Sequence, residues 1–323
     1  MARALICGVS GQDGGYLAKL LLDKGYEVFG TSRDAEVSTF ANLTTLGLRS
    51  LVKVESMAVN DFRSVLQVIH KIQPDEIYNL AGQSSVGLSF MQPVETLESI
   101  SIASLNLLEA IRFIKTPIRF YNAGSSECYG DTGGQPADEN TPFRPRSPYA
   151  VAKSAAYWQV ANYREAYGLF ACSGNLFNHE SPLRPERFVT RKIISTACRI
   201  ALGSKEKLTL GNIQIQRDWG WAPEYVEAMW LMLQQPQPED YVIATGVSTS
   251  LQDFIVHAFA RLKLDWKDHV KVDAGLKRPT DLSRGCANPS KAADKMGWRA
   301  RSTVKEVIDR MIDADLERLK KTS

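Results

Sequence analysis

The stretch Ala4-Leu-Ile-Cys-Gly-Val-Ser-Gly-Gln-Asp-Gly14 decides the fold predicted for this chain. Four apolar residues predict a buried strand, and three glycines follow it before a helix-like run. Glycines let the backbone turn tightly and approach a pyrophosphate, whose charge a helix N-terminus stabilises. A glycine triplet alone also occurs in plain turns, but this one lies between a strand and a helix. We therefore expect a dinucleotide site that includes Gly8, Ser10, Gly11, Gln12, Asp13 and Gly14.

Strand-like and helix-like segments alternate over the first half of the chain. Strands are expected near residues 4–7, 26–31, 51–54, 76–80, 118–123 and 170–176, and helices near 16–24, 61–72, 96–114 and 148–167. This alternation predicts an α/β fold with a Rossmann-type, doubly wound parallel sheet. We expect residues 1–177 to form the dinucleotide-binding domain. Residues 178–323 are expected to form a smaller, mixed, C-terminal substrate-binding domain, some of whose segments return to the sheet.

Composition excludes several classes of protein. The 323 residues include 39 Lys and Arg against 36 Asp and Glu, a balance that gives no case for a nucleic-acid partner. The sequence has no apolar run of the roughly 20 residues that span a bilayer, and no signal peptide is recognisable, so we expect a cytoplasmic protein without a membrane partner. The five cysteines are scattered and suggest reduced thiols. With no metal-ligand spacing either, we predict no metal.

The residues after the second predicted strand bear on the choice of cofactor. Ser32-Arg33-Asp34 lie about 20 residues beyond the glycine loop, where selectivity for the adenosine ribose is set. Arg33 is expected to hold the 2′-phosphate of NADP. In the alternative, Arg33 is solvated and Asp34 accepts a ribose hydroxyl of NAD. We expect NADP, with NAD the less favoured cofactor.

Tyr149 and Lys153 stand four residues apart at the start of a predicted helix, so their side chains share one face. A lysine ammonium beside a tyrosine favours the phenolate, which can accept a proton from a hydroxyl while hydride leaves for a nicotinamide. Such a pair alone is weak, because both residues are common on helix faces. Together with the glycine loop and with Ser125-Ser126-Glu127 after a strand, it predicts a dehydrogenase-type enzyme.

A dense group of cations lies just beyond residue 177. Arg184, Arg187, Arg191 and Lys192 fall within nine residues. Such density is more often a solvated face, but arginine forks also match phosphate oxygens, as a sugar diphosphate requires. His179, just before this group, is expected to make a structural hydrogen bond rather than act as a base.

Eight further motifs extend over most of the chain: FNHESP (177–182), FVTRK (188–192), LGN (210–212), RDWG (217–220), YVEAMW (225–230), RPT (278–280), NLAGQS (79–84) and RSPY (146–149). In these motifs the chain resembles the extended short-chain dehydrogenase/reductase family, which acts on nucleotide sugars, and within it the GDP-mannose 4,6-dehydratases. The resemblance runs from Gly8 to about Leu316. It implies cofactor contacts by Leu80 and Ala81, a GDP-sugar substrate, and a homodimer or homotetramer.

The resemblance implies a role for each site residue. Ser125 would hydrogen-bond the hydroxyl that is oxidised, beside Tyr149 and Lys153. Glu127 would act as the general acid and base that a 4,6-dehydration requires, since the C5 proton becomes acidic once C4 is a ketone. The substrate residues would be Ser84, Ser126, Asn178, Val189, Lys192, Arg217, Arg278 and Asp281. Alternatively, Glu127 caps a loop or pairs with a basic side chain. Some nucleotide-sugar decarboxylases and epimerases also carry a glutamate after a Ser/Thr pair.

Several positions depart from the pattern of these dehydratases. Ser125 replaces a threonine, Cys128-Tyr129 replaces Met-Phe as in epimerases and decarboxylases, and Asp34 replaces a second arginine. An aspartate expected near Ala58 is missing. Asp281 replaces a glutamate, and the segment 282–286 after it is polar where relatives are often apolar.

Three hypotheses follow. The first is a GDP-mannose 4,6-dehydratase, which Glu127 favours. The second is a related enzyme, an epimerase, 4-dehydrogenase or reductase, acting on another nucleotide sugar such as a GDP-hexose or GDP-heptose. The third is a dinucleotide-binding regulator without catalysis, against which the joint presence of Ser125, Tyr149 and Lys153 argues.

Overall fold

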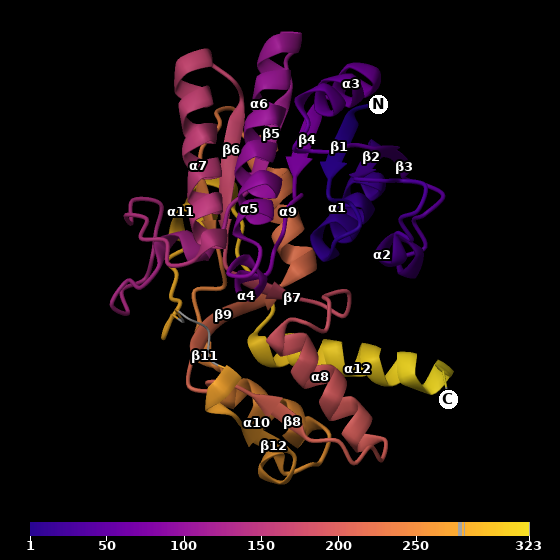
Figure 1. Ribbon diagram of the computed structural model, residues 1–323, viewed down its shortest axis with the longest axis vertical. Helices are drawn as coiled ribbons and strands as arrows, with labels where there is room; N and C mark the ends of the chain where they lie inside the picture. Colours follow the sequence, from indigo (N-terminus) through magenta and orange to yellow (C-terminus); the bar gives the residue numbers. More distant parts are fainter. Residues whose placement is uncertain (277–279, 281, 323) are drawn as a thin grey trace.

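A parallel sheet forms the upper part of the molecule (Figure 1). The computed structural model of the chain describes residues 1–276, 280 and 282–322. The seven strands lie in the order β10-β6-β5-β4-β1-β2-β3, and every pair is parallel. The predicted doubly wound sheet is therefore confirmed. The strands are β1 (Arg3–Cys7), β2 (Glu27–Ser32), β3 (Lys53–Ser56), β4 (Glu76–Asn79), β5 (Arg119–Ala123), β6 (Ala171–Leu176) and β10 (Tyr241–Ile243).

Two apolar cores lie on the two faces of this sheet. In β1, Ala4 and Ile6 face the core that α1, α2 and α9 cover, whereas Leu5 and Cys7 face the core under α3, α6 and α7. Because both faces of a doubly wound sheet are covered, its strands are apolar throughout rather than alternating. The covering helices are α1 (Gln12–Asp23), α2 (Ala41–Thr45), α9 (Ala222–Gln234), α3 (Phe62–Ile72), α6 (Ala103–Ile114) and α7 (Pro148–Tyr167).

Local signals explain where individual helices begin and end. The carboxylate of Asp61 accepts the backbone N–H groups of residues 63 and 64 at the start of α3. Ser147 caps α7 in the same way, Pro148 occupies its first turn, and Gly168 ends it in the left-handed conformation. The helix expected at 96–114 is instead divided into α5 (Pro93–Leu97), a π-helical turn η1 (Glu98–Ile102) and α6.

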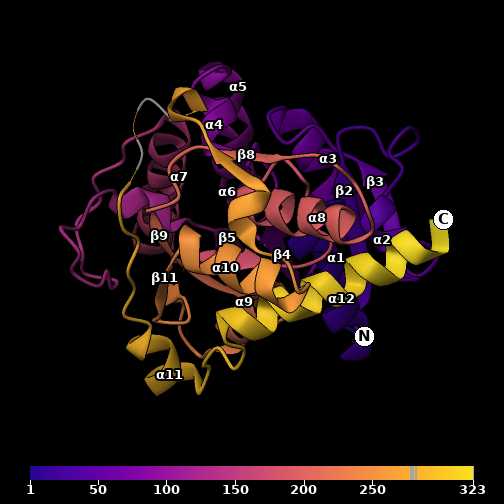
Figure 2. The same ribbon diagram turned by 90° about the horizontal axis from the view of Figure 1, so that it is seen from below.

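A smaller part lies beyond the carboxyl ends of the sheet strands (Figures 1 and 2). It contains a three-stranded sheet, β11-β9-β7, and a two-stranded parallel sheet, β12-β8. Helices α8 (Val189–Ala201), α10 (Leu251–Arg261) and α12 (Val304–Thr322) share one apolar core with them. Its strands are β7 (Asn178–Glu180), β8 (Leu208–Leu210), β9 (Gln216–Trp221), β11 (Ser248–Ser250) and β12 (Val270–Val272). The remaining elements are α4 (Val86–Ser89), η2 (Ser126–Tyr129), η3 (Trp266–Asp268), η4 (Ala274–Leu276) and α11 (Ser290–Met296).

The chain crosses between the two parts after residue 177. Helix α9 packs against α1, and β10 extends the large sheet beside β6, although both follow the segments of the smaller part. The crossing places β7 and the loop after it directly under the ends of the sheet strands (Figure 1).

A buried ion pair fastens α12 to α8. The guanidinium of Arg191 donates to both carboxylate oxygens of Asp315, one of the bonds measuring 2.6 Å, and each side chain is only 2% exposed. In the sequence, Arg191 is one of four clustered cations that could bind the phosphates of a sugar diphosphate. The structure uses it instead as a structural partner of a residue far along the chain.

We predict that Asp315→Ala lowers the free energy of unfolding by about 3–5 kcal/mol, because it leaves the Arg191 guanidinium buried without its carboxylate. Urea unfolding would measure the loss. The matched control is Asp313→Ala, because Asp313 lies on α12 like Asp315 but is exposed, where it pairs with Arg261 of α10. This substitution should lower the free energy of unfolding by less than about 1 kcal/mol. Equal losses in the two variants would contradict the structural role assigned to the buried pair.

Candidate active site

A cavity of about 720 Å³ lies between the strand ends of the large sheet and the smaller part. Every residue predicted to bind the cofactor lines it: Gly8, Ser10, Gly11, Gln12, Asp13, Gly14, Arg33, Leu80, Ala81, Tyr149 and Lys153. Ser84, Ser125, Ser126, Glu127, Asn178, Val189 and Arg217 line it as well. Since β1 lies between β4 and β2, the cavity opens at the point where the strand order reverses, which is where doubly wound folds bind ligands.

The glycine loop forms one wall of the cavity. Gly8 has a φ of +84°, and a Cβ on Gly14 would lie 2.6 Å from the Gly8 carbonyl oxygen. The loop could not close in this way with larger residues at the two positions. It leads into the N-terminus of α1, whose exposed N–H groups favour a negative charge. The cradle therefore fits the pyrophosphate of a nicotinamide dinucleotide.

Tyr149 and Lys153 are both buried on the first turns of α7. The Lys153 ammonium donates to the Ala123 carbonyl at 2.7 Å and lies 5.9 Å from the centre of the Tyr149 ring. Burial lowers the pKa of Lys153 to about 8. Burial raises the pKa of Tyr149 above its ordinary value, and a hydrogen bond with Ser125 works in the other direction. The sequence predicted that Lys153 would favour the phenolate, whereas the loss of solvent around Tyr149 has the larger effect on the pKa of the phenol.

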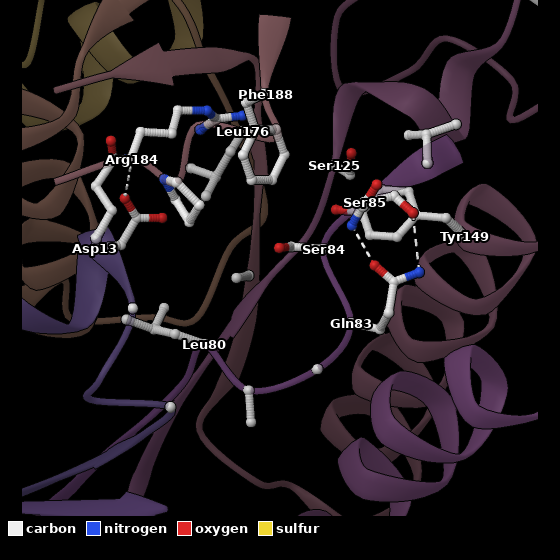
Figure 3. A pocket seen from close by; sticks show the side chains of 18 of the residues that line it. Asp13, Leu80, Gln83, Ser84, Ser85, Ser125, Tyr149, Leu176, Arg184 and Phe188 are labelled. Atoms are coloured by element: carbon white, nitrogen blue, oxygen red, sulfur yellow. Dashed lines mark hydrogen bonds between the residues drawn. The ribbon is translucent and has the colours of Figure 1, made fainter. Parts of the chain in front are cut away.

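The segment after β5 brings three further side chains to the cavity that Tyr149 lines. Ser125 caps the short helix η2, with its hydroxyl accepting the Glu127 N–H at 3.3 Å. This turn directs Ser126 and Glu127 into the cavity that Tyr149 lines. Figure 3 shows Ser125 beside Tyr149 and across the pocket from Asp13 and Arg184. The predicted catalytic residues thus lie around one space.

His179 connects the glycine loop to β7. Its Nε2 pairs with Asp13 at 2.9 Å, its Nδ1 bonds the Phe177 carbonyl at 2.8 Å, and its ring stacks on Tyr225. Burial opposes a charge on either partner, but their mutual attraction outweighs it, so the pKa of Asp13 is lowered and that of His179 is raised. The structural hydrogen bond expected of His179 is confirmed.

The loop from residue 181 to residue 188 is held by a buried carboxylate. Glu180 accepts a hydrogen bond from the Thr190 hydroxyl at 2.6 Å and pairs with Arg184 at 3.0 Å. Arg184, Arg187 and Phe188 consequently line the cavity. Sequence reasoning gave no individual role to Gln83, Asn42 or Phe188, which also line it, because only the folded loops bring them there.

Some predicted residues lie elsewhere. Lys192 is not among the residues that line the cavity, and its ammonium donates to the Thr209 carbonyl at 2.8 Å. Arg278 and Asp281 lie outside the described residues. Cys128 and Tyr129, two departures from the dehydratase pattern, are buried and do not line the large cavity. The replacement of Met-Phe by Cys128-Tyr129 therefore affects the packing of the η2 turn on the side that does not line the large cavity.

Within residues 1–276, 280 and 282–322, no group of three or more His, Cys, Asp or Glu side chains is placed to hold a metal ion. The helices in the same part of the chain are too short or too polar to cross a membrane.

Comparison with known proteins identifies the family. Residues 5–311 match the family model described as GDP-mannose 4,6 dehydratase. GDP-mannose 4,6 dehydratase 1 of Arabidopsis thaliana is 46% identical over 98% of this chain and 91% of its own, and the GDP-mannose 4,6-dehydratase of Sinorhizobium fredii is 44% identical over 99% and 98%.

Solved structures show the same fold. The Thermus thermophilus UDP-glucose 4-epimerase complex with NAD superposes with a TM-score of 0.85 at 25% identity over 97% of this chain and 98% of its own. RMD from Pseudomonas aeruginosa, complexed with NADPH, gives 0.81 at 21% identity over 98% and 100%. With a family model that covers nearly its whole length and relatives well above 40% identity, the chain belongs to the GDP-mannose 4,6-dehydratase family.

Proposed function

We propose that this chain converts GDP-mannose to GDP-4-keto-6-deoxymannose by 4,6-dehydration, with NADP as its cofactor. The observation that carries the proposal is the placement of Ser125, Glu127, Tyr149 and Lys153 around the same cavity that the glycine loop lines. An epimerase or a reductase has no need of a carboxylate at the position of Glu127. The dehydration does need one, and the family to which the chain belongs is consistent with it.

Each side chain has a distinct task in this proposal. Tyr149 takes the proton of the C4 hydroxyl, which Ser125 orients through a hydrogen bond. The positive charge of Lys153 stabilises the Tyr149 phenolate, which is the form that can accept this proton. A bound nicotinamide would supply the hydride chemistry, accepting hydride from C4 and returning it to C6. Glu127 removes the acidic C5 proton and delivers a proton to the C6 hydroxyl, which leaves as water. When hydride adds to C6, C5 takes up a proton again, and the release of the proton that Tyr149 took from the C4 hydroxyl balances this uptake.

The nucleotide end of the substrate is assigned to the other side of the cavity. We assign it to Asn178, Val189 and Arg217, with Ser84 and Ser126 near the hexose. The Arg217 guanidinium also donates to the Leu282 carbonyl at 2.8 Å, which ties it to the segment behind the cavity. Lys192, Arg278 and Asp281 stay in the proposal on the strength of the sequence pattern.

The test of this function is to incubate the purified protein with GDP-mannose and follow the sugar nucleotide by mass spectrometry. We expect the sugar nucleotide to lose the mass of one water, with no net consumption of the cofactor. A product of unchanged mass but altered stereochemistry would contradict it and favour a related epimerase. Turnover of a different nucleotide sugar alone would contradict the choice of substrate.

Glu127→Gln should lower the rate of dehydration by about 10²–10⁴-fold, because the amide cannot exchange the C5 proton. C4 oxidation should survive, so the absorbance of reduced nicotinamide should appear on the enzyme without loss of water. Tyr149→Phe is the matched variant, since it should block oxidation and show neither signal. Normal water loss by Glu127→Gln would remove this residue from the mechanism.

The pKa of Lys153 predicts a pH limit. Lys153 carries its proton below a pKa of about 8 and loses it above that value. If the ammonium is the form that assists Tyr149, kcat/KM should fall by about tenfold per pH unit above the pKa. A pH profile of GDP-mannose dehydration measures this limb. A profile that stays flat to about pH 10, near the ordinary pKa of lysine, would contradict the role.

We also propose that the protein is a cytoplasmic homodimer or homotetramer. Apolar side chains are exposed along the neighbouring helices η1, α6 and α7, at Ile102, Phe113, Val151, Trp158 and Tyr167. The free cysteines suit a reducing compartment. A self-association surface on these helices would bury the apolar side chains together.

Trp158→Arg should weaken self-association by roughly thirtyfold, the loss of about 2 kcal/mol expected for an aromatic residue at the centre of an interface. Sedimentation equilibrium measures it. Val247→Arg, which places the same charge on an exposed apolar residue of the smaller part, is the control. A wild-type monomer at micromolar concentration would contradict the oligomer, and an unchanged constant in Trp158→Arg would contradict this surface.

A further inference from the structure

An ion pair joins two walls of the cofactor cavity near its outer end. Arg33 follows β2, and Glu95 lies on α5, 62 residues later in the chain. An Nη of Arg33 lies 3.0 Å from a Glu95 carboxylate oxygen. Both residues line the large cavity. The Arg33 side chain is 79% exposed and that of Glu95 is 45% exposed, so solvent and ligand can reach both.

Arg33 occupies the position that meets the adenosine ribose in doubly wound folds, because it directly follows the second strand. Of the residues in the first half of the chain that line the cavity, it is the only lysine or arginine before Lys153. A 2′-phosphate would therefore depend on this one guanidinium for its charge-assisted hydrogen bonds. The free hydroxyl of NAD at the same place carries no charge and has no such need.

Asp34 is the other residue after β2 that could contact the adenosine ribose, but its carboxylate is engaged with the backbone of its own turn. Its carboxylate accepts the backbone N–H groups of Glu36 at 2.9 Å and Val37 at 3.3 Å, and it does not line the cavity. The alternative in which Asp34 accepts a ribose hydroxyl therefore finds no support in this geometry. Glu95 is the acidic side chain that contacts Arg33 and faces the cavity.

We propose that Glu95 is a specificity-determining residue for the cofactor, one that narrows the preference for NADP over NAD by competing with the 2′-phosphate for Arg33. The inference rests on the proposed nicotinamide cofactor and refines it. A 2′-phosphate must displace the carboxylate from the guanidinium or share the guanidinium with it, and the two anions repel each other at this distance. NAD has no 2′-phosphate, so its binding requires no displacement of the Glu95 carboxylate and brings no second anion close to it.

The effect should be moderate and sensitive to salt. Exposed ion pairs are weak, so Arg33 can leave Glu95 for a phosphate at little cost. We expect removal of the Glu95 charge to tighten NADP binding by about three- to tenfold, with NAD binding changed by less than about twofold. Because both groups are exposed, the difference should shrink as ionic strength shortens the range of the charges.

The test is a double-mutant cycle on dinucleotide binding, measured by calorimetry without any sugar nucleotide. The oxidised forms of NADP and NAD are titrated into the wild type, Glu95→Gln, Arg33→Ala and the double variant. Glu98→Gln is the matched control, since Glu98 is exposed, lies three residues away and does not line the cavity. We expect Glu95→Gln to tighten NADP binding selectively, and the gain to vanish when Arg33 is absent.

Four outcomes would overturn the inference by itself. NADP affinity could be unchanged in Glu95→Gln, both dinucleotides could gain equally, or Glu98→Gln could match the gain through general charge alone. A gain that persisted in the Arg33→Ala background would likewise show that Glu95 does not act through Arg33. Any of these can occur in an enzyme that dehydrates GDP-mannose normally. A wild type that bound neither dinucleotide would instead overturn this inference and the proposed function together.

Discussion

Gln12 and Asp13, in the first turn of α1, bond across the boundary between the two parts of the molecule. The Gln12 side chain receives a hydrogen bond from Ser181 at 2.7 Å and donates to the His179 carbonyl at 3.2 Å, and Asp13 pairs with the His179 ring. Residues of the glycine loop thus fix the segment that starts the smaller part. The position of the glycine loop relative to the loop from residue 181 to residue 188 depends on these few bonds.

The same contact explains why polar groups are buried at this boundary. A charged pair buried without further partners costs more than it returns, but Asp13 also accepts from Gln12, and His179 also bonds the Phe177 carbonyl. The next residue in the chain, Glu180, pairs with Arg184 and accepts a hydrogen bond from the Thr190 hydroxyl. Asp13 and His179 are both fully engaged in this way, so they can hold two loops in a single arrangement rather than leave them to move apart.

The sequence was sufficient for the sheet, the glycine loop and α7, because each depends on neighbouring residues. Apolar runs, Ser147, Pro148 and Gly168 are local signals, and the placement of Tyr149 and Lys153 on one helical face follows from them. The roles of the four cations between residues 184 and 192 could not be predicted from neighbouring residues. Arg191 pairs with Asp315, 124 residues away, and nothing in the spacing of four cations distinguishes that partner from a phosphate. The raised pKa of Tyr149 was missed for a related reason, since burial is a property of the whole fold.

The departures from the family pattern separate into two groups once they are placed in space. Cys128 and Tyr129 belong to η2, and their side chains are buried; Tyr129 packs on Phe143 and Phe177 and accepts a hydrogen bond from Asn175. A change there can be absorbed by repacking, while Ser125 and Glu127 still enter the cavity from the same turn. Asp34 lies at the cofactor end, and its carboxylate serves its own turn. Resemblance to epimerases at positions 128 and 129 therefore says little about the reaction, which depends on which groups face the sugar.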